Sequence, residues 1–181
     1  MKKSSFRYLL ALLPLIALFG SAYAHKTEPG KSFPEAPFKF FSYDDMRAEG
    51  AVLITNAADI NARALRLFSK SFKTAANASW YATKEGGFVA KFSQDGIDTR
   101  VNYDHKGNWA GTVRTYTEAN LPKDIRHIIK STYYDYSIFL VQEVTVGDKT
   151  AYLVKMEDST SLKTVRVIDG EMDEYESYKK G

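Results

Sequence analysis

Hydrophobic residues recur along the chain at two spacings, and segments with the two spacings follow one another in a fixed order. In residues 59–76 and 120–133 the apolar positions lie three or four residues apart, with charged residues between them. This spacing is typical of an amphipathic helix that buries one face. Pro122 and Asp124 stand near the start of the second segment, where a proline and an acidic residue both favour a helix. The expected buried positions are Ile60, Ala64, Leu67, Phe68, Ser71, Phe72, Leu121, Ile125, Ile128, Ile129 and Thr132.

Each predicted helix is followed by four short segments in which apolar and polar residues alternate. Alternation with a period of two is typical of β-strands that have one buried face. Short polar segments, most of them with glycine, separate these strands, and Asp169-Gly170 is a strong signal for a two-residue hairpin. The segments are 80–83, 88–93, 98–104 and 109–117 after the first helix, and 137–146, 151–157, 162–168 and 171–178 after the second.

The two sets of segments also match residue by residue. The stretch 88–92 lies 64 positions before 152–156, counting from 88 to 152, and later strands and turns keep nearly the same offset. A fixed offset over several strands indicates an internal repeat. The sequence therefore predicts an α+β fold in which a unit of one helix plus a four-stranded antiparallel sheet occurs twice in tandem. The predicted units are 59–118 and 119–181, with the helices on one sheet face.

Residues 1–24 have the layout of a secretory signal peptide. A basic start precedes an apolar stretch, 8–19, and the small-x-small pattern Ala22-Tyr23-Ala24 ends it. At ~1.5 Å per residue a helix of this stretch covers roughly 18 Å, short of the ~30 Å hydrocarbon core of a bilayer. We therefore expect a periplasmic or secreted protein without stable membrane insertion after cleavage. Residues 25–58, which carry several prolines, are expected to form a flexible leader.

Composition removes several classes of function. The chain has 25 basic and 22 acidic residues, and three of the basic ones lie in the predicted signal peptide, which leaves 22 of each after cleavage. A neutral chain gives no support to nucleic acid binding. The sequence contains no cysteine, so disulfides, thiolate zinc sites and cysteine nucleophiles are excluded. Its 12 tyrosines, 11 phenylalanines and 2 tryptophans can supply a core by packing alone.

Several short motifs follow one another along the chain: Phe68 with Phe72, Asn77-Ala-Ser-Trp80, Phe88-Val-Ala-Lys-Phe92, Tyr103-Asp-His-Lys-Gly-Asn-Trp109, Leu121-Pro-Lys-Asp-Ile125 and Val167-Ile-Asp-Gly170. In their order and spacing they resemble the PepSY-like or β-lactamase-inhibitor-like family of exported bacterial proteins. The resemblance covers residues 59–178 and implies tandem helix-plus-sheet units whose strands form a continuous, slightly concave surface. In the secreted β-lactamase inhibitor such a surface holds a protein partner. That inhibitor's units carry disulfides, and this chain has none.

No motif in the sequence points to catalysis or to a bound cofactor. A nucleophile elbow, a phosphate-binding loop and an HExxH helix are all absent. Adjacent acidic pairs, such as Asp44-Asp45 and Asp173-Glu174, would point to opposite faces of a strand, which does not suit general acid–base catalysis. We therefore expect no catalytic residue, no cofactor and no metal site, and we do not expect an enzyme.

One alternative concerns His25, which becomes the N-terminal residue if cleavage follows Ala24. An N-terminal histidine can chelate copper through its amine and imidazole, as in copper-dependent polysaccharide oxygenases, and His105 or His127 would have to supply a second ligand. We expect instead that His25 is incidental. His105 in a predicted turn and His127 in a predicted helix are expected to be surface or partly buried residues.

The alternation within the strands also divides the side chains between two sheet faces. If Phe88, Ala90 and Phe92 face the helices, the opposite, open face carries basic and aromatic side chains. Arginine and tyrosine are common anchors of protein interfaces. This face is the predicted binding surface for an acidic protein, peptide or glycan, although outward Lys, Arg and Thr are also ordinary on a half-exposed sheet. The predicted partner-binding residues are Lys91, Arg100, Arg114, Tyr116, Lys155 and Arg166.

A second candidate site is the run Tyr133-Tyr134-Asp135-Tyr136, where one or two tyrosines are expected to pack with the hydroxyl outward. The sequence as a whole favours an exported non-enzymatic binding module, such as an inhibitor or regulator of an envelope protein, with its partner unidentified. The alternatives are a structural or adaptor component of an envelope assembly and, more remotely, a copper-binding enzyme that uses His25.

Overall fold

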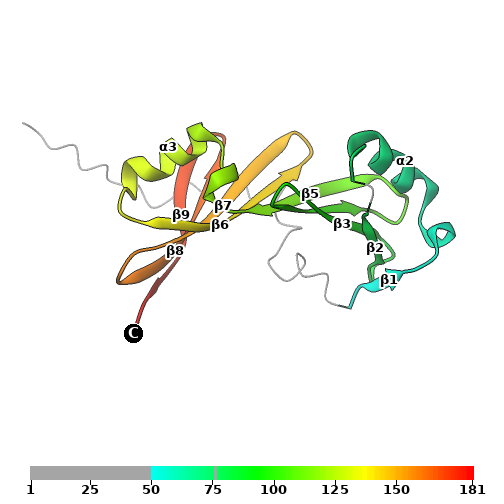
Figure 1. Ribbon diagram of the computed structural model, residues 1–181, viewed down its shortest axis with the longest axis horizontal. Coiled ribbons are helices and arrows are strands. Elements are labelled where there is room, and N and C mark those ends of the chain that lie inside the picture. The colour runs from blue at the N-terminus through cyan, green and yellow to red at the C-terminus, as the bar shows by residue number, and fades with distance from the viewer. Residues whose placement is uncertain (1–49, 76) are drawn as a thin grey trace, which may run out of the picture. The chain divides into compact units, whose positions relative to one another are not determined.

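The computed structural model describes residues 50–75 and 77–181, and within them one antiparallel sheet carries two α-helices (Figure 1). The nine strands of this sheet follow one another in chain order, so each strand pairs with the next. The strands are β1 (Val52–Ile54), β2 (Ser79–Ala82), β3 (Phe88–Gln94), β4 (Ile97–Tyr103), β5 (Trp109–Tyr116), β6 (Ser137–Val146), β7 (Lys149–Glu157), β8 (Ser161–Ile168) and β9 (Glu171–Lys179). The helices are α2 (Ala62–Ser71) and α3 (Lys123–Thr132), each preceded by a 3₁₀ turn, η1 (Ala57–Asp59) and η2 (Glu118–Asn120).

Both helices lie where the 3.6-residue spacing predicts them, but each starts about one turn later. The Asn61 side chain caps α2, because its Oδ1 accepts a hydrogen bond from the Arg63 backbone nitrogen at 2.9 Å. Pro122 precedes the first residue of α3, and Asp124 lies in its first turn. The residues before each cap form the tighter 3₁₀ turns, which the apolar spacing does not distinguish from an α-helix.

Helix α2 covers the first strands through a cluster of aromatic rings. The ring centroid of Phe68 lies 5.3 Å from that of Phe72, 5.3 Å from that of Trp80 and 5.7 Å from that of Phe92. Ala64 has no exposed surface, which lets the helix approach the sheet closely. This cluster confirms that the even-numbered positions of β3 face the helix.

Helix α3 covers the later strands through aliphatic side chains. Ile125 and Ile129 of the helix pack in one cluster with Val141, Val154 and Val165 from β6, β7 and β8. Ile129 and the three valines are completely buried. Burying such a side chain stabilises the fold by about 1.5–3 kcal/mol relative to leaving it in water.

The strand register shows that α2 and α3 lie on the same face of the sheet. Val101, beneath α2, is aligned with Thr112, Thr145 and Thr150 on the following strands. Val154, beneath α3, lies four residues after Thr150 on β7, and residues an even number apart on a strand share a face. Figure 1 shows both helices above the same side of the strands.

The predicted tandem of two four-stranded sheets is wrong. Strand β5 pairs with β6 from Thr112 to Tyr116 against Val141 to Thr145, so the candidate units are joined into one undivided sheet. The reason is that alternation locates strands but does not reveal which edges pair. The last strand of the first set and the first strand of the second set each have an edge of unpaired backbone N–H and C=O groups. These two edges hydrogen-bond to each other. Strand β1, in the segment 25–58, adds a ninth strand.

Candidate functional site

The register decides which predicted binding residues share a face, and we call the side away from α2 and α3 the far face. Lys91 and Arg100 lie on the far face, because the residues next to them in the chain, Ala90 and Val101, face α2 and successive side chains of a strand point to opposite faces. They are direct cross-strand partners on β3 and β4, and both are half-buried. Lys155 on β7 and Arg166 on β8 also lie on the far face, because the positions beside them, Val154 and Val165, face α3.

Arg114 and Tyr116 lie instead on the helix face, so the expectation that they join Lys91 and Arg100 is wrong. Tyr116 is 3% exposed and belongs to the core beneath α3. Its hydroxyl donates a 2.6 Å hydrogen bond to Glu143 Oε2, and Arg114 forms a 3.3 Å ion pair with Glu143 Oε1. Burial, followed by the hydrogen bond to Glu143, raises the pKa of Tyr116.

An irregularity in β5 explains this wrong assignment. The β4–β5 register shifts between Asn102 and Tyr103, so that Tyr103 pairs with Trp109, whereas Asn102 pairs with Gly111. Beyond the shift, Val113 is aligned with Arg100 on the far face. A bulge of this kind inserts one residue and reverses the phase of the alternation. Trp109 and Val113 therefore face opposite sides, although their even spacing predicts a shared one.

Lys91 and Arg100 line a concavity of about 420 Å³ on the far face. The Lys91 Nζ lies 4.8 Å from the centroid of the Tyr81 ring, a cation–π distance. Arg100 Nε donates a hydrogen bond of 3.1 Å to Asn102 Oδ1. Burial and, second, the nearby charge of Arg100 lower the pKa of Lys91. Polar side chains from the neighbouring strands complete the lining, namely Ser79, Asp98, Thr115 and Gln142.

An apolar row continues from this concavity along the far face. Val113, Val144, Ala151 and Ile168 are aligned on β5 to β8 and are only 5%, 3%, 3% and 4% exposed. An alternating pattern with one solvent-exposed side predicts a uniformly polar far face. The buried apolar row shows that the far face is not uniformly polar. The row gives this face an apolar floor flanked by charged and aromatic side chains.

The other two predicted residues of the far face have different surroundings. Arg166 is bound to Asp173 of β9 by two hydrogen bonds, from Nε at 3.1 Å and from a terminal nitrogen at 2.9 Å. Its guanidinium lies 5.5 Å from the centroid of the Tyr175 ring. Lys155 is aligned with Thr164, further along the same strands. The structure thus brings together Lys91 with Arg100, and places Lys155 and Arg166 three and four strands beyond Arg100.

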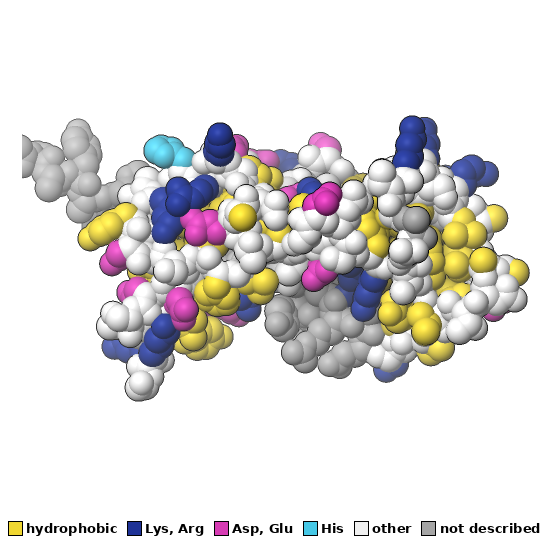
Figure 2. Space-filling model, viewed as in Figure 1, with side chains coloured by type: hydrophobic (Ala, Val, Ile, Leu, Met, Phe, Trp, Pro, Cys, Tyr) yellow, Lys and Arg dark blue, Asp and Glu magenta, His cyan; other side chains and the backbone are white. Residues whose placement is uncertain are grey.

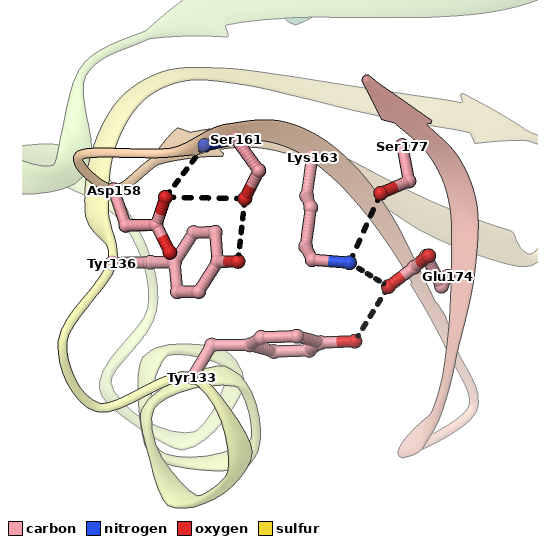
Figure 3. Close-up of polar contacts among 7 residues, drawn as sticks. All are labelled: Tyr133, Tyr136, Asp158, Ser161, Lys163, Glu174 and Ser177. Atoms are coloured by element: carbon pink, nitrogen blue, oxygen red, sulfur yellow. Dashed lines mark hydrogen bonds and ion pairs between the residues drawn. The ribbon is translucent and has the colours of Figure 1, made fainter. Parts of the chain in front are cut away.

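The tyrosine run after α3 joins a polar cluster on the helix face (Figure 3). Tyr133 donates a hydrogen bond of 3.2 Å to Glu174 Oε2, which also accepts one of 2.5 Å from Lys163 Nζ. The Tyr136 hydroxyl lies 2.7 Å from Ser161 Oγ, and both tyrosines pack against the core. Burial and Glu174 raise the pKa of Tyr133. The described side chains of this cluster bond to one another, so it ties the end of α3 to the last hairpin.

The acidic pair in β9 divides between the two faces. Asp173 binds Arg166 on the far face, and Glu174 binds Lys163 on the helix face. Counting back from the two-residue hairpin at Asp169-Gly170 would have placed Arg166 opposite Asp173. The sequence therefore did contain a signal for this ion pair.

The described residues contain neither a metal-binding cluster nor a membrane-spanning helix. His105 is exposed in the β4–β5 turn and His127 is exposed on α3. Residues 50–75 and 77–181 contain no cluster of three His, Cys, Asp or Glu side chains that could hold a metal. Within the same residues no helix combines the length and the apolar character needed to span a bilayer. The predicted signal peptide, His25 and the leader up to residue 49 lie outside the described residues.

Solved structures with the same fold come from Bacteroides. A DUF2874 family protein from Bacteroides uniformis matches with a TM-score of 0.51 and 17% identity, over 66% of this chain and 89% of its own. A BLIP-like protein from Bacteroides fragilis matches with a TM-score of 0.51 and 20% identity, over 66% and 86%. The fold is BLIP-like. A candidate periplasmic protein from Bacteroides eggerthii matches this BLIP-like fold with a TM-score of 0.50 and 17% identity, over 65% and 87%.

No protein-family model matches the chain, and no curated protein matches it. At identities of 17–20% the structural likeness shows the fold alone. The PepSY-like part of the resemblance stays a prediction.

Proposed function

We propose that the chain is an exported, non-enzymatic binding module whose far face engages a protein partner. The observation that carries this proposal is the exposure of Leu162, Tyr175 and Tyr178 at one end of the far face, at 37%, 54% and 60%. Leu162 and Tyr178 are aligned on β8 and β9, and Tyr175 lies beside Arg166. We call these three residues the aromatic patch. Grouped exposed apolar side chains, with tyrosine and arginine among them, are typical of protein interfaces.

The helix face offers much less to a partner. Most of its apolar side chains are covered by α2 and α3, although Trp109 is 38% exposed. Charged side chains of this face bind one another, as Arg114 does with Glu143 and Lys163 with Glu174. On the other side of the sheet, hydrophobic side chains reach the surface below the strands (Figure 2). The far face is therefore the better candidate for a partner surface.

The comparisons and the sequence support the export and the binding role. A protein of the same fold is named BLIP-like. The resemblance of the sequence to the β-lactamase-inhibitor-like family implies a partner held on a sheet surface. Another protein of the same fold is a candidate periplasmic protein, which agrees with the predicted signal peptide and a periplasmic or secreted location here. The proposal does not name the partner, because a fold can host many functions.

The test compares capture by matched surface variants in a native envelope fraction. Leu162→Ala combined with Tyr178→Ala removes two side chains of the aromatic patch, and we expect it to reduce partner recovery at least tenfold. Tyr134→Ala is the control, because Tyr134 is 79% exposed but lies beside the end of α3. Equal recovery by wild type and by both variants would contradict the proposal. Circular dichroism establishes that each variant is folded.

A further inference from the structure

We propose that β1 pairs edge to edge with β1 of a second copy of this chain, so that two sheets join into one across a two-fold axis. This surface is separate from the aromatic patch, and the inference does not depend on the proposed function. Strands β1 and β9 are the two edges of the sheet within the described residues. An edge strand presents a row of backbone N–H and C=O groups that can pair with a strand of another chain.

The β9 edge carries features by which proteins keep a sheet edge from pairing. Four acidic residues lie within Glu171–Lys179, and the β8–β9 register shifts so that Tyr175 is an extra, bulged residue. The β1 edge has neither feature. Residues 51–57 contain no charged residue and no proline, and the pairing of β1 with β2 is regular from Val52 to Ile54. One edge of the sheet is therefore protected against pairing, and the other is not.

Strand β1 also exposes apolar side chains on both faces of the sheet. Val52 is 68% exposed and Leu53 is 52% exposed. Ile54 packs against the cluster beneath α2, so Val52 and Ile54 lie on the helix face and Leu53 lies on the far face. β-Branched and apolar residues of this kind favour strand pairing. An exposed apolar edge strand is a typical pairing site.

The sequence of β1 is self-complementary in an antiparallel pairing centred on Leu53. In this register Val52 of each copy lies opposite Ile54 of the other, and Leu53 lies opposite Leu53. Each cross-strand pair is then apolar, and its two side chains share a face. The cluster beneath α2, which reaches this edge at Ile54, would continue into Val52 of the second copy. These matches favour a second copy of the chain as the occupant of the edge.

The pairing closes at two copies. Because the same strand pairs on both sides of a two-fold axis, the interface is isologous, and the charged β9 edges do not extend the sheet further. Strand β1 has three residues, so the pairing buries less surface than a standard interface and the dimer is expected to be reversible. Since β9 lies at the opposite edge of each sheet, the dimer would leave both aromatic patches accessible.

Sedimentation velocity of the purified exported chain over a dilution series measures this association. Wild type is expected to shift reversibly between monomer and dimer. Leu53→Lys and Leu53→Glu each place like charges opposite each other at the axis, so each should weaken dimerisation at least about tenfold. An equimolar mixture of L53K and L53E places opposite charges there and should dimerise at least about tenfold more strongly than either variant alone. Tyr134→Lys, at a 79% exposed site beside the end of α3, should leave dimerisation within about twofold of wild type.

A second measurement uses the absence of cysteine from the chain. Position 53 lies opposite itself in the proposed dimer, so Leu53→Cys should form a disulfide-linked dimer under mild oxidation faster than Tyr134→Cys. Equal rates of cross-linking at the two positions would contradict the proposed register. Urea unfolding followed by circular dichroism establishes that each variant is folded.

Two sedimentation results would overturn the inference. One is a wild type that stays monomeric at every concentration, and the other is a mixture of L53K and L53E that dimerises no better than either variant alone. A monomeric wild type whose partner capture is lost in L53K would assign β1 to the partner and would also overturn it. A wild type that dimerises, with partner capture unchanged in L162A/Y178A, would refute the proposed function and leave this inference standing. A monomeric wild type whose capture is lost in L162A/Y178A would do the reverse.

Discussion

The turn between β4 and β5 touches the start of α2 through Gly107. Its φ of +78° lies in the left-handed region, which L side chains rarely adopt. A methyl group on Gly107 would lie 2.3 Å from Asn61 Oδ1 and 2.9 Å from the Ala64 backbone nitrogen. The same Asn61 oxygen accepts the hydrogen bond from Arg63 that caps α2. We therefore expect Gly107→Ala to strain the turn and disturb the helix cap together.

The magnitude follows from three contributions. The left-handed conformation costs an alanine about 1–2 kcal/mol. Loss of the Asn61 cap costs about 1 kcal/mol, and relief of the contact with the Ala64 backbone costs about 1 kcal/mol or more. Gly96 is a matched control, because its φ is +75° and nothing lies within 4 Å of a methyl group there. Gly96→Ala should therefore cost only about 1–2 kcal/mol, and Gly107→Ala about 2 kcal/mol more.

Urea unfolding followed by circular dichroism measures this difference. The midpoint should fall further for Gly107→Ala than for Gly96→Ala, with similar slopes. Adding Asn61→Ala to Gly107→Ala should cost less than Asn61→Ala costs alone, because the cap is already disturbed. Equal free energies of unfolding for the two glycine variants would refute the contact between this turn and α2.

Two further predictions concern the core beneath α2. Phe68→Ala should lower the free energy of unfolding by about 3–5 kcal/mol, because Phe68 is 6% exposed and contacts three aromatic rings. Phe139 is 44% exposed, so in the same urea assay Phe139→Ala should lower the free energy of unfolding by about 1 kcal/mol or less. Burial raises the pKa of Tyr103 to about 12. The unfolded chain then releases this proton near pH 10, and the folded chain releases it only near pH 12. The free energy of unfolding should therefore decrease by about 1–2 kcal/mol as the pH rises from about 10 to about 12. Tyr103→Phe should make this decrease smaller, whereas Tyr134→Phe, at an exposed site, should leave it unchanged. Identical profiles of the free energy of unfolding against pH for both variants would argue against a buried phenol at position 103.

The sequence predicted the local elements well because their signals are local. The spacing of Ile125 and Ile129 reflects one face of a helix, and the alternation through 88–92 reflects one face of a strand. The hairpin at Asp169-Gly170 also formed as predicted, with both residues at positive φ, as its tight turn requires.

The pairing of strands that are distant in the chain could not be predicted from these local patterns. Whether β5 meets β6 depends on two edges separated by α3, and the alternation within each strand is the same in either case. The bulge near Asn102 and Tyr103 reversed the phase of β5 without a distinctive residue at that point. For this reason Lys91 and Arg100 were placed together correctly, whereas Arg114 and Tyr116 were assigned to the wrong face.

Site-specific photo-crosslinking tests most directly whether the far face meets a protein partner. A photoreactive phenylalanine analogue would replace Tyr178 in one variant and Tyr134 in another, since both tyrosines are exposed but lie on different sides of the sheet. After irradiation in the native envelope fraction, the account predicts one discrete adduct from position 178 that position 134 does not form. Adducts of the same mass and yield from both positions, or from position 134 alone, would contradict it.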